Sequence, residues 1–257
     1  MALHLVAKHQ SQPDGGSTPN AVIALMEADG SAIHDHVRRM RSADRRGWTD
    51  RRSASDRDGQ VDRRAAAPGP TRADMVMAHR VDLADAVHAL CAVHGAHRSL
   101  ADQARGHPAL DSASGWLGEV ASALADERGH LARTVSASGP LPSTPGQAAT
   151  DNALGVQRHA FQMLARSDRV GVAMGAAVAL ALDWPAIRAV IDRAAEAYGL
   201  ALPVPALPDA GETAEMLSRL DDGAGVRRAA LFGARALLDQ HRALWTLLEA
   251  RTRARRG

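Results

Sequence analysis

The chain has 257 residues, a formal net charge of +2, 46% hydrophobic residues and only 3% aromatic residues. This length allows a sizeable core, built mainly from Ala, Leu, Val and Met. The single cysteine, Cys91, excludes an internal disulfide and a CxxC zinc site. The small net charge disfavours nucleic-acid binding. No signal peptide is recognised, and no uncharged apolar run reaches the ~20 residues that span a bilayer. We therefore expect a cytoplasmic protein without a membrane association.

Residues 1–73 differ in composition from the rest of the chain. Asp-Arg-Arg recurs from positions 44, 50 and 62 with few apolar residues between the repeats. Such a segment buries too little surface to offset the entropy lost on ordering. Residues 20–40 have a weak apolar face that could support one short helix. Otherwise we predict that residues 1–73 are disordered and dispensable, and that residues 74–257 form one helical domain. One alternative is a basic arm for nucleic acid, which the interleaved aspartates disfavour. A second is translation from Met75 or Met77.

The first two predicted helices form an antiparallel pair. A heptad pattern runs from Thr71 or Asp74 to about Arg105, where Gly-His-Pro ends it. A second pattern runs over residues 112–138, and Gly-Pro-Leu-Pro follows it. The short connection between the two patterns makes the helices antiparallel neighbours.

The longest pattern predicts a single helix from Thr144 to Asp183. Thr144 and Gln147 have the spacing of a capping box. Gly171 and Gly175 lie in the apolar seam, so a neighbouring backbone can approach closely there. Pro185 is expected to end this helix, and Asp183 is expected to cap the next one.

The C-terminal third is predicted to hold two short helices and one long one. One short helix ends at Gly199, and the proline-rich residues 200–208 are extended. Asp209 and Glu212 cap a second short helix, and a long helix covers residues 226–253. Its direction relative to the central helix is left open. The sequence thus predicts an all-α fold, a bundle of four long and two short helices. Four arginines are expected to form a solvated tail: Arg251, Arg253, Arg255 and Arg256.

Each long helix places an ionisable residue in its apolar seam. These residues are His94 and His97, Glu127, Asp168 and His241. Inward-facing histidines and carboxylates are the ligands of metal sites in helical bundles. Reflecting the helices about their turns brings Asp168 level with His97 and close to His94, and brings Glu127 level with Gln157. The two layers are about 15 Å apart, which is too far for a di-metal centre.

Two interpretations of these polar residues remain. The favoured one is a pair of hydrogen-bonded layers that fix the helix register, without a cofactor. The alternative is a site for one divalent metal ion, held by His94, His97, Asp168 and His241. His88 and His130 lie off the seams and are predicted to face solvent.

Several short motifs resemble those of a known group. The motifs are PSTPGQ at 142–147, QRH at 157–159, SDR at 167–169, DW at 183–184, Ile187-Arg188, LFG at 231–233, and QH with LWTLLEAR within 240–251. Together they resemble a bacterial domain-of-unknown-function family of small helical proteins, over about residues 75–257. The resemblance implies a helical fold and no particular activity.

No phosphate loop, nucleophile elbow or other assembled catalytic set is recognised. We therefore expect a non-enzymatic binding or interaction module whose partner is another protein or a second copy of the chain. The alternative is a helical enzyme that binds a metal ion or small molecule through the seam histidines and Asp168.

Overall fold

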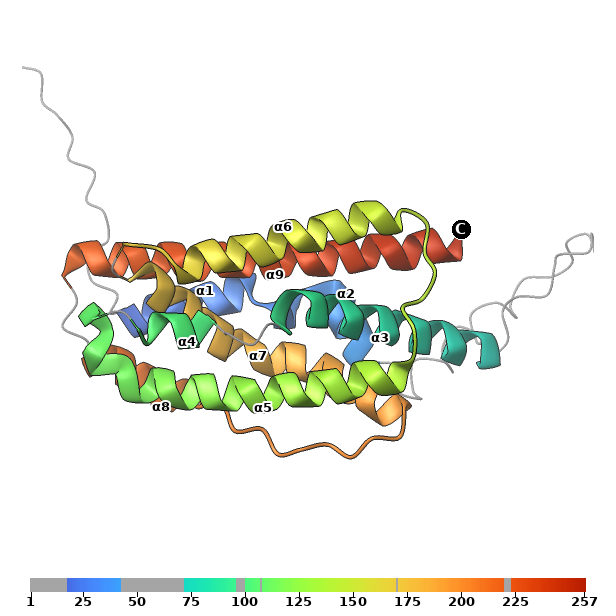
Figure 1. The fold of residues 1–257 in the computed structure, drawn as a ribbon, viewed down its shortest axis with the longest axis horizontal. Coiled ribbons are helices and arrows are strands. Elements are labelled where there is room, and N and C mark those ends of the chain that lie inside the picture. Colours follow the sequence, from blue (N-terminus) through green and yellow to red (C-terminus); the bar gives the residue numbers. More distant parts are fainter. Residues whose placement is uncertain (1–17, 43–71, 96–99, 107, 170, 220–222) are drawn as a thin grey trace, which may run out of the picture.

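The computed structural model describes residues 18–42, 72–95, 100–106, 108–169, 171–219 and 223–257 (Figure 1). Within these ranges the chain contains helices and no strand, which confirms the predicted fold class. The helices are α1 (Thr18–Asp29), η1 (Ser31–Ile33), α2 (Asp35–Ser42), α3 (Arg72–His94), α4 (Leu100–Ala104), η2 (Pro108–Ala113), α5 (Ser114–Ser138), α6 (Gln147–Ala165), α7 (Val172–Ala197), α8 (Ala210–Arg219) and α9 (Ala224–Arg256). Five of them, rather than the expected four, have 19 or more residues: α3, α5, α6, α7 and α9.

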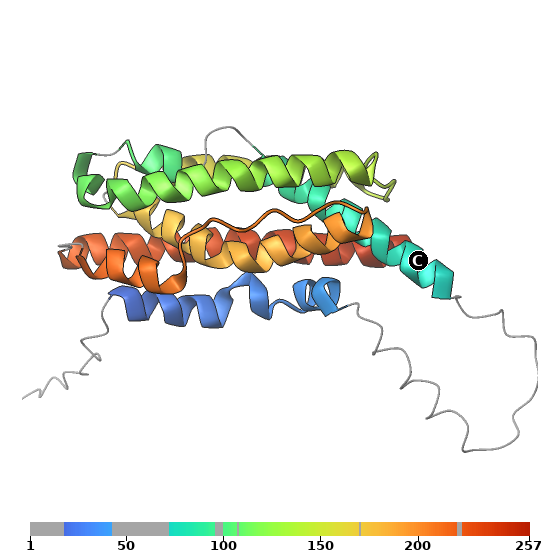
Figure 2. The ribbon, with the colours of Figure 1, turned by 90° about the horizontal axis from the view of Figure 1, so that it is seen from below.

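The helix α7 lies at the centre of the bundle and packs most extensively against α9. Figure 2 shows α3, α4 and α5 on one side of these two helices, and α1 and α2 on the other. The helix α6 lies beside α9, on the face seen in Figure 1. The burial of α7 accounts for its composition. By length and apolarity α7 alone among the described helices passes as a membrane span, yet 83% of its most apolar window is buried in the bundle.

Glycines allow α7 and α9 to pack with their backbones in contact. A Cβ atom at Gly175 would lie 1.8 Å from the carbonyl oxygen of Ala230, and one at Gly233 would lie 2.0 Å from that of Val172. The close approach predicted for Gly175 is therefore confirmed, and its partner is α9. Further along, Asp183 of α7 contacts His241 of α9, so the two helices run parallel.

The prediction of a single central helix over residues 144–183 is wrong. The segment forms two helices, because Gly171 adopts a φ of 102° and the chain reverses direction between α6 and α7. One helix of 40 residues would extend for about 60 Å and carry its apolar half out of the bundle. The capping box at Thr144 is also wrong, because Gly146 is the N-cap and no side chain caps the helix.

The break predicted at Pro185 is absent, and α7 continues through it. Proline removes one backbone hydrogen bond, at a cost of about 3 kcal/mol in a helix interior. The residues on either side of Pro185, Trp184 and Ala186, are buried in the bundle. Tertiary packing of this kind outweighs local helix preference.

The N-terminal prediction is wrong for residues 18–42. These residues form α1, η1 and α2, which bury Val22, Ser31, Val37 and Met40 against α7 and α9. The weak apolar pattern here suffices because two helices of the bundle already present a complementary surface. Residues 1–17 and 43–71 lie outside the described part of the chain.

The predicted solvated tail is wrong for two of its four arginines. Arg251 is 4% exposed and donates hydrogen bonds to both carboxylate oxygens of Asp85 on α3, at 2.7–3.0 Å. Arg255 bridges Asp82 and Asp85, with distances of 2.7 Å to each. These ion pairs attach the end of α9 to α3.

The first predicted helix was expected to reach about Arg105, but α3 ends at His94 and α4 covers Leu100–Ala104. Three other local predictions are confirmed. The helix α5 covers residues 114–138, and residues 200–208 are free of helix and run back along the bundle in Figure 1. At the start of α8, the backbone N–H of Asp209 donates to Glu212, and that of Glu212 donates to Asp209, both at 2.8 Å. This is the reciprocal pairing of a capping box.

Candidate functional site

A buried carboxylate, Asp183, is the centre of a hydrogen-bonded group inside the bundle. Asp183 is 1% exposed and accepts a hydrogen bond of 2.6 Å from Nδ1 of His241. It also accepts bonds from the backbone N–H and the hydroxyl of Ser31, at 2.7 and 2.5 Å. Ser31 in turn accepts a bond of 2.8 Å from Nε1 of Trp245. Burial alone would raise the pKa of Asp183, but the bonds from His241 and Ser31 hold it below the ordinary value.

An aromatic cluster lies against the outer side of His241. The ring of His94 is 5.1 Å from that of His241 and 5.4 Å from that of Trp184, between ring centres. Phe161 of α6 completes the cluster, 5.1 Å from His94. Burial, followed by the neighbouring His241, lowers the pKa of His94 well below its ordinary value, so its imidazole is neutral at pH 7.

Polar atoms in this cluster lack a protein partner in the described part of the chain. They are Nε2 of His94, Nε2 of His241 and Nε1 of Trp184. A buried polar group without a hydrogen bond costs about 1–3 kcal/mol. Three such groups on adjacent rings lower the stability of the fold at this place. A local loss of stability of this kind is typical of functional sites.

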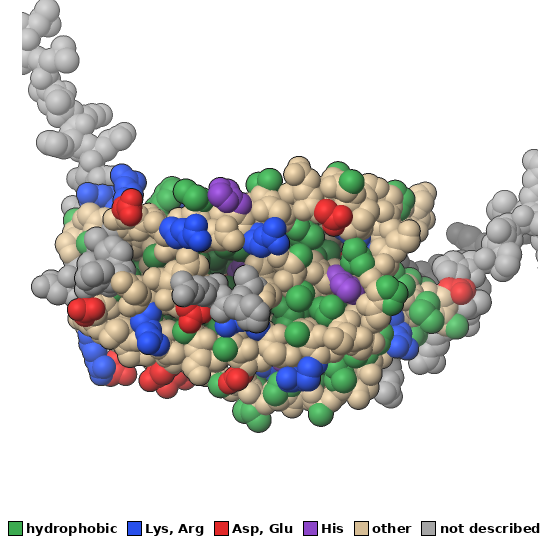
Figure 3. Space-filling view, viewed as in Figure 1, with side chains coloured by type: hydrophobic (Ala, Val, Ile, Leu, Met, Phe, Trp, Pro, Cys, Tyr) green, Lys and Arg blue, Asp and Glu red, His purple; other side chains and the backbone are tan. Residues whose placement is uncertain are grey.

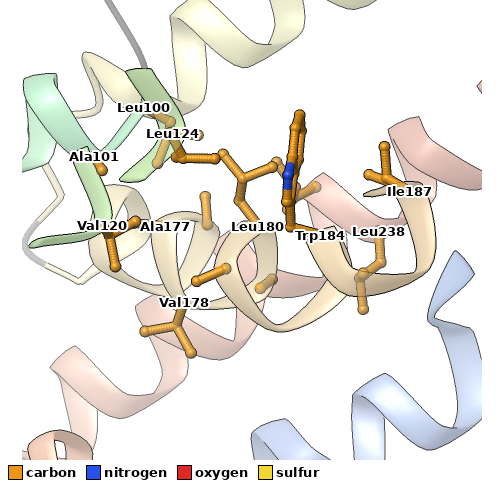
Figure 4. Packing of buried hydrophobic residues seen from close by; sticks show 14 of the residues in the cluster. Leu100, Ala101, Val120, Leu124, Ala177, Val178, Leu180, Trp184, Ile187 and Leu238 are labelled. Carbon is orange, nitrogen blue, oxygen red and sulfur yellow. The ribbon is translucent and has the colours of Figure 1, made fainter. Parts of the chain in front are cut away.

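His94, Phe161 and Trp184 also form part of the wall of a cavity of about 240 Å³ that opens at the surface. We call it the α4–α6 pocket. Its apolar residues are Val93, Leu100, Leu124, Phe161, Leu180, Trp184 and Leu237. Figure 4 shows Leu100, Leu124 and Leu180 grouped on one side of the Trp184 ring. The remaining lining residues are polar: His94, Gln103, Arg128, Arg158, Gln162 and Arg166.

The mouth of the pocket carries an excess of positive charge. Arg158 lies on α6, Arg166 is the residue that follows the end of α6, and Arg128 lies on α5. Among the described residues, no aspartate or glutamate lines the pocket, and none of these three arginines forms an ion pair. On this face, Figure 3 shows basic side chains over α6 beside a hollow with hydrophobic side chains in it. An apolar interior with convergent polar groups at its mouth is the usual architecture of a small-molecule site.

Among the described residues, the structure brings together two of the predicted metal ligands, His94 and His241. Asp168 is exposed in the turn after α6, so the register that placed it beside His94 is wrong. The reversal of the chain at Gly171 removes Asp168 from the core. His97 lies outside the described residues. In the described part, no group of three or more His, Cys, Asp or Glu side chains is arranged to hold a metal ion.

The second predicted polar layer is also rearranged. Glu127 pairs with Arg188 at 2.5 Å, both being buried, rather than with Gln157. Gln157 donates to the backbone carbonyl of Gln240 at 3.4 Å. His130, predicted to face solvent, is 1% exposed and contacts Asp192 at 2.9 Å. His88 is half-buried against the carbonyl of Gly139.

Asp183, Ser31 and the three arginines of the pocket were not among the predicted site residues. Asp183 was assigned to a helix cap, although a carboxylate at the end of a long apolar run is itself a signal of a buried polar partner. No sequence signal identifies the arginines, because arginines on the outer faces of α5 and α6 read as ordinary solvated residues.

The neutral state of His94 predicts a pH dependence of stability. In the unfolded chain, the imidazole of His94 binds a proton below about pH 6.5. In the folded protein it binds this proton only at a lower pH, because its pKa is lowered. The free energy of unfolding should therefore fall as the pH is lowered from about 7 to 5, by up to about 1.4 kcal/mol per pH unit for this proton. Urea unfolding at several pH values measures the slope.

The variant His94→Phe should reduce this slope and keep the aromatic packing. Part of the slope should persist, because burial also lowers the pKa of His36 to about 4, with the same sign. An unchanged slope in the variant would mean that His94 ionises with its ordinary pKa in the folded protein.

The fold and the site together define the class of protein. It is an all-α bundle with a buried Asp–His pair and an apolar pocket that has arginines at its mouth. The chain belongs to DUF6975, a family of unknown function, whose family model matches residues 55–256. The match covers most of the chain and leaves out α1, η1 and α2, although Ser31 of η1 contacts Asp183. Neither a curated protein nor a solved structure matches the chain.

Proposed function

We propose that this protein is a binding module for a small molecule, and that the α4–α6 pocket holds the ligand. The supporting observation is the pocket itself: an apolar interior at the meeting point of α3, α4, α5, α6, α7 and α9, with arginines and glutamines at its mouth. A site of this kind buries the apolar body of a ligand and orients its polar end.

Binding is favoured over catalysis because of where the Asp183–His241 pair lies. An aspartate that orients a histidine is a familiar arrangement for a general base. However, His241 is not among the residues that line the pocket, and the rings of His94 and Phe161 are packed against it. The expectations of a protein partner or of self-association, and of a cytoplasmic location, stay predictions.

Binding of the neutral fluorophore N-phenylnaphthylamine tests the proposal, because its fluorescence rises in an apolar environment. We expect saturable binding of one molecule per chain. Gln162→Trp and Gln103→Trp place large side chains at the mouth and should each weaken binding at least tenfold, since they fill the space that the ligand requires.

Val156→Trp is the matched control. Val156 is exposed on α6, the same helix as Gln162, and does not line the pocket. This variant should bind the fluorophore as the wild type does. Absence of binding to the wild type, or equal binding by all four proteins, would contradict the proposal.

A further inference from the structure

We infer that the ligand of the α4–α6 pocket is a free organic anion: an aromatic or branched apolar body that carries a carboxylate, sulfonate or phosphate group. The inference rests on the proposed function and specifies the chemistry of its ligand. Arg128, Arg158 and Arg166 would bind the charged group, and the leucines and Trp184 would enclose the body.

The buried arginines of the protein differ from those of the pocket in their pairing. Arg188, Arg251 and Arg255, the best-buried guanidinium groups, are each paired with a carboxylate at 2.5–2.7 Å. The three arginines of the pocket have no such partner among the described residues. Like charges gathered in one place repel each other, and an anion relieves this repulsion.

These charges also surround a concave site. Arg158 on α6, Arg166 just after it and Arg128 on α5 all line one cavity. A cleft with low-dielectric walls focuses the field of charges of one sign and raises the local concentration of the opposite ion. Guanidinium groups also bind carboxylates and phosphates with two parallel hydrogen bonds.

The apolar part of the pocket favours an organic ligand over a purely inorganic ion. Leu100, Leu124 and Leu180 line the pocket and lie on one side of the Trp184 ring (Figure 4). An inorganic anion at the mouth would leave this apolar surface uncovered. A ligand with an apolar body removes the surface from water, at a gain of roughly 25 cal/mol per Å² buried.

A pair of matched fluorophores tests the inference. Anilinonaphthalene sulfonate and N-phenylnaphthylamine share one aromatic body and differ only in the sulfonate group. We expect the sulfonate to bind at least tenfold more tightly than the neutral compound. This preference should decrease as the salt concentration rises, because salt screens charges at an exposed mouth.

The double variant Arg158→Gln/Arg166→Gln should bind the sulfonate at least tenfold more weakly than the wild type. Its affinity for the neutral probe should differ from that of the wild type by less than twofold. The control Arg133→Gln/Arg235→Gln removes the same charge from exposed positions outside the pocket and should change neither affinity by more than twofold. Equal binding of the two probes by the wild type would overturn the inference. An equal loss in the control would do so too, since it would show an effect of net charge alone.

The outcomes separate this inference from the proposed function. If the neutral probe binds and the sulfonate is not preferred, the proposed binding module is supported and the proposed anionic ligand is contradicted. Failure of both probes to bind would remove both proposals. Sedimentation with phosphatidylglycerol vesicles distinguishes the source of the anion. A free ligand predicts that the protein stays in the supernatant, whereas recovery in the pellet would indicate a lipid headgroup and overturn the assignment.

Discussion

Replacement of Asp85 by alanine is expected to destabilise the protein by about 3–5 kcal/mol. Asp85 is 1% exposed and accepts hydrogen bonds from Arg251 and Arg255, which lie more than 160 residues away in the sequence. Among the described residues, the substitution leaves the buried Arg251 guanidinium with hydrogen bonds to Thr150 and Gln147 and no carboxylate. An uncompensated buried charge is costly because the interior replaces its hydration poorly. Urea unfolding at pH 7 measures the loss.

Two further variants make the result specific to this ion pair. Glu215→Ala breaks an exposed pair with Arg219 on α8 and should cost no more than about 1 kcal/mol. Asp85→Leu/Arg251→Met removes both charges, and it should recover a large part of the stability lost in Asp85→Ala. If Asp85→Ala costs as little as Glu215→Ala, the arginines find other partners or water, and the network does not stabilise the end of α9.

Replacement of Gly175 by alanine is expected to lower the free energy of unfolding by about 1–3 kcal/mol, and replacement by leucine is expected to lower it further. The new Cβ atom would lie 1.8 Å from the carbonyl oxygen and 2.6 Å from the Cα atom of Ala230, so a backbone must move. The helices α7 and α9 would separate along the most extensive contact of the bundle. The melting temperature should fall by about 2–4 °C for each kcal/mol lost.

Gly155→Ala is the control for this substitution. Gly155 also lies within a helix, α6, but an added Cβ atom there meets no neighbour within 4 Å. Alanine should therefore stabilise the protein at this position by roughly 0.5–1 kcal/mol, through its better helix propensity. A Gly175→Ala protein as stable as Gly155→Ala would show that α7 and α9 are not in backbone contact in solution.

The two proposals for the pocket depend on different features of the same site. The binding module depends on the shape and apolarity of the cavity, and the anion depends on Arg128, Arg158 and Arg166. The pocket and the Asp183–His241 pair are connected through the ring of His94, which contacts the pair on one side and lines the pocket on the other.

Local sequence patterns predict most of the helices from residue 72 onward. The heptad pattern of α5, the reciprocal cap of Asp209 and Glu212 and the extended residues 200–208 were all predicted. Each depends on interactions between residues a few positions apart, namely backbone hydrogen bonds, caps and the restriction of φ by proline. The close approach at Gly175 was also predictable, because glycine within a helix is unfavourable unless a neighbour requires the space.

The turns between helices and the contacts between polar residues depend on tertiary packing. The spacing of apolar residues continues from α6 into α7, but Gly171 reverses the chain and leaves Asp168 exposed. Residues 18–42 become helical because they cover α7 and α9, a surface that no local pattern reveals.

The site shows the same dependence on long-range contacts. Asp183 forms hydrogen bonds with His241 and Ser31, which are 58 and 152 residues away from it in the sequence. The three arginines of the pocket come together only because α5 and α6 both border one cavity. A buried carboxylate requires partners wherever in the chain they originate, and an exposed arginine requires none. The composition of such a site therefore follows from the packing of the helices and not from the periodicity that forms them.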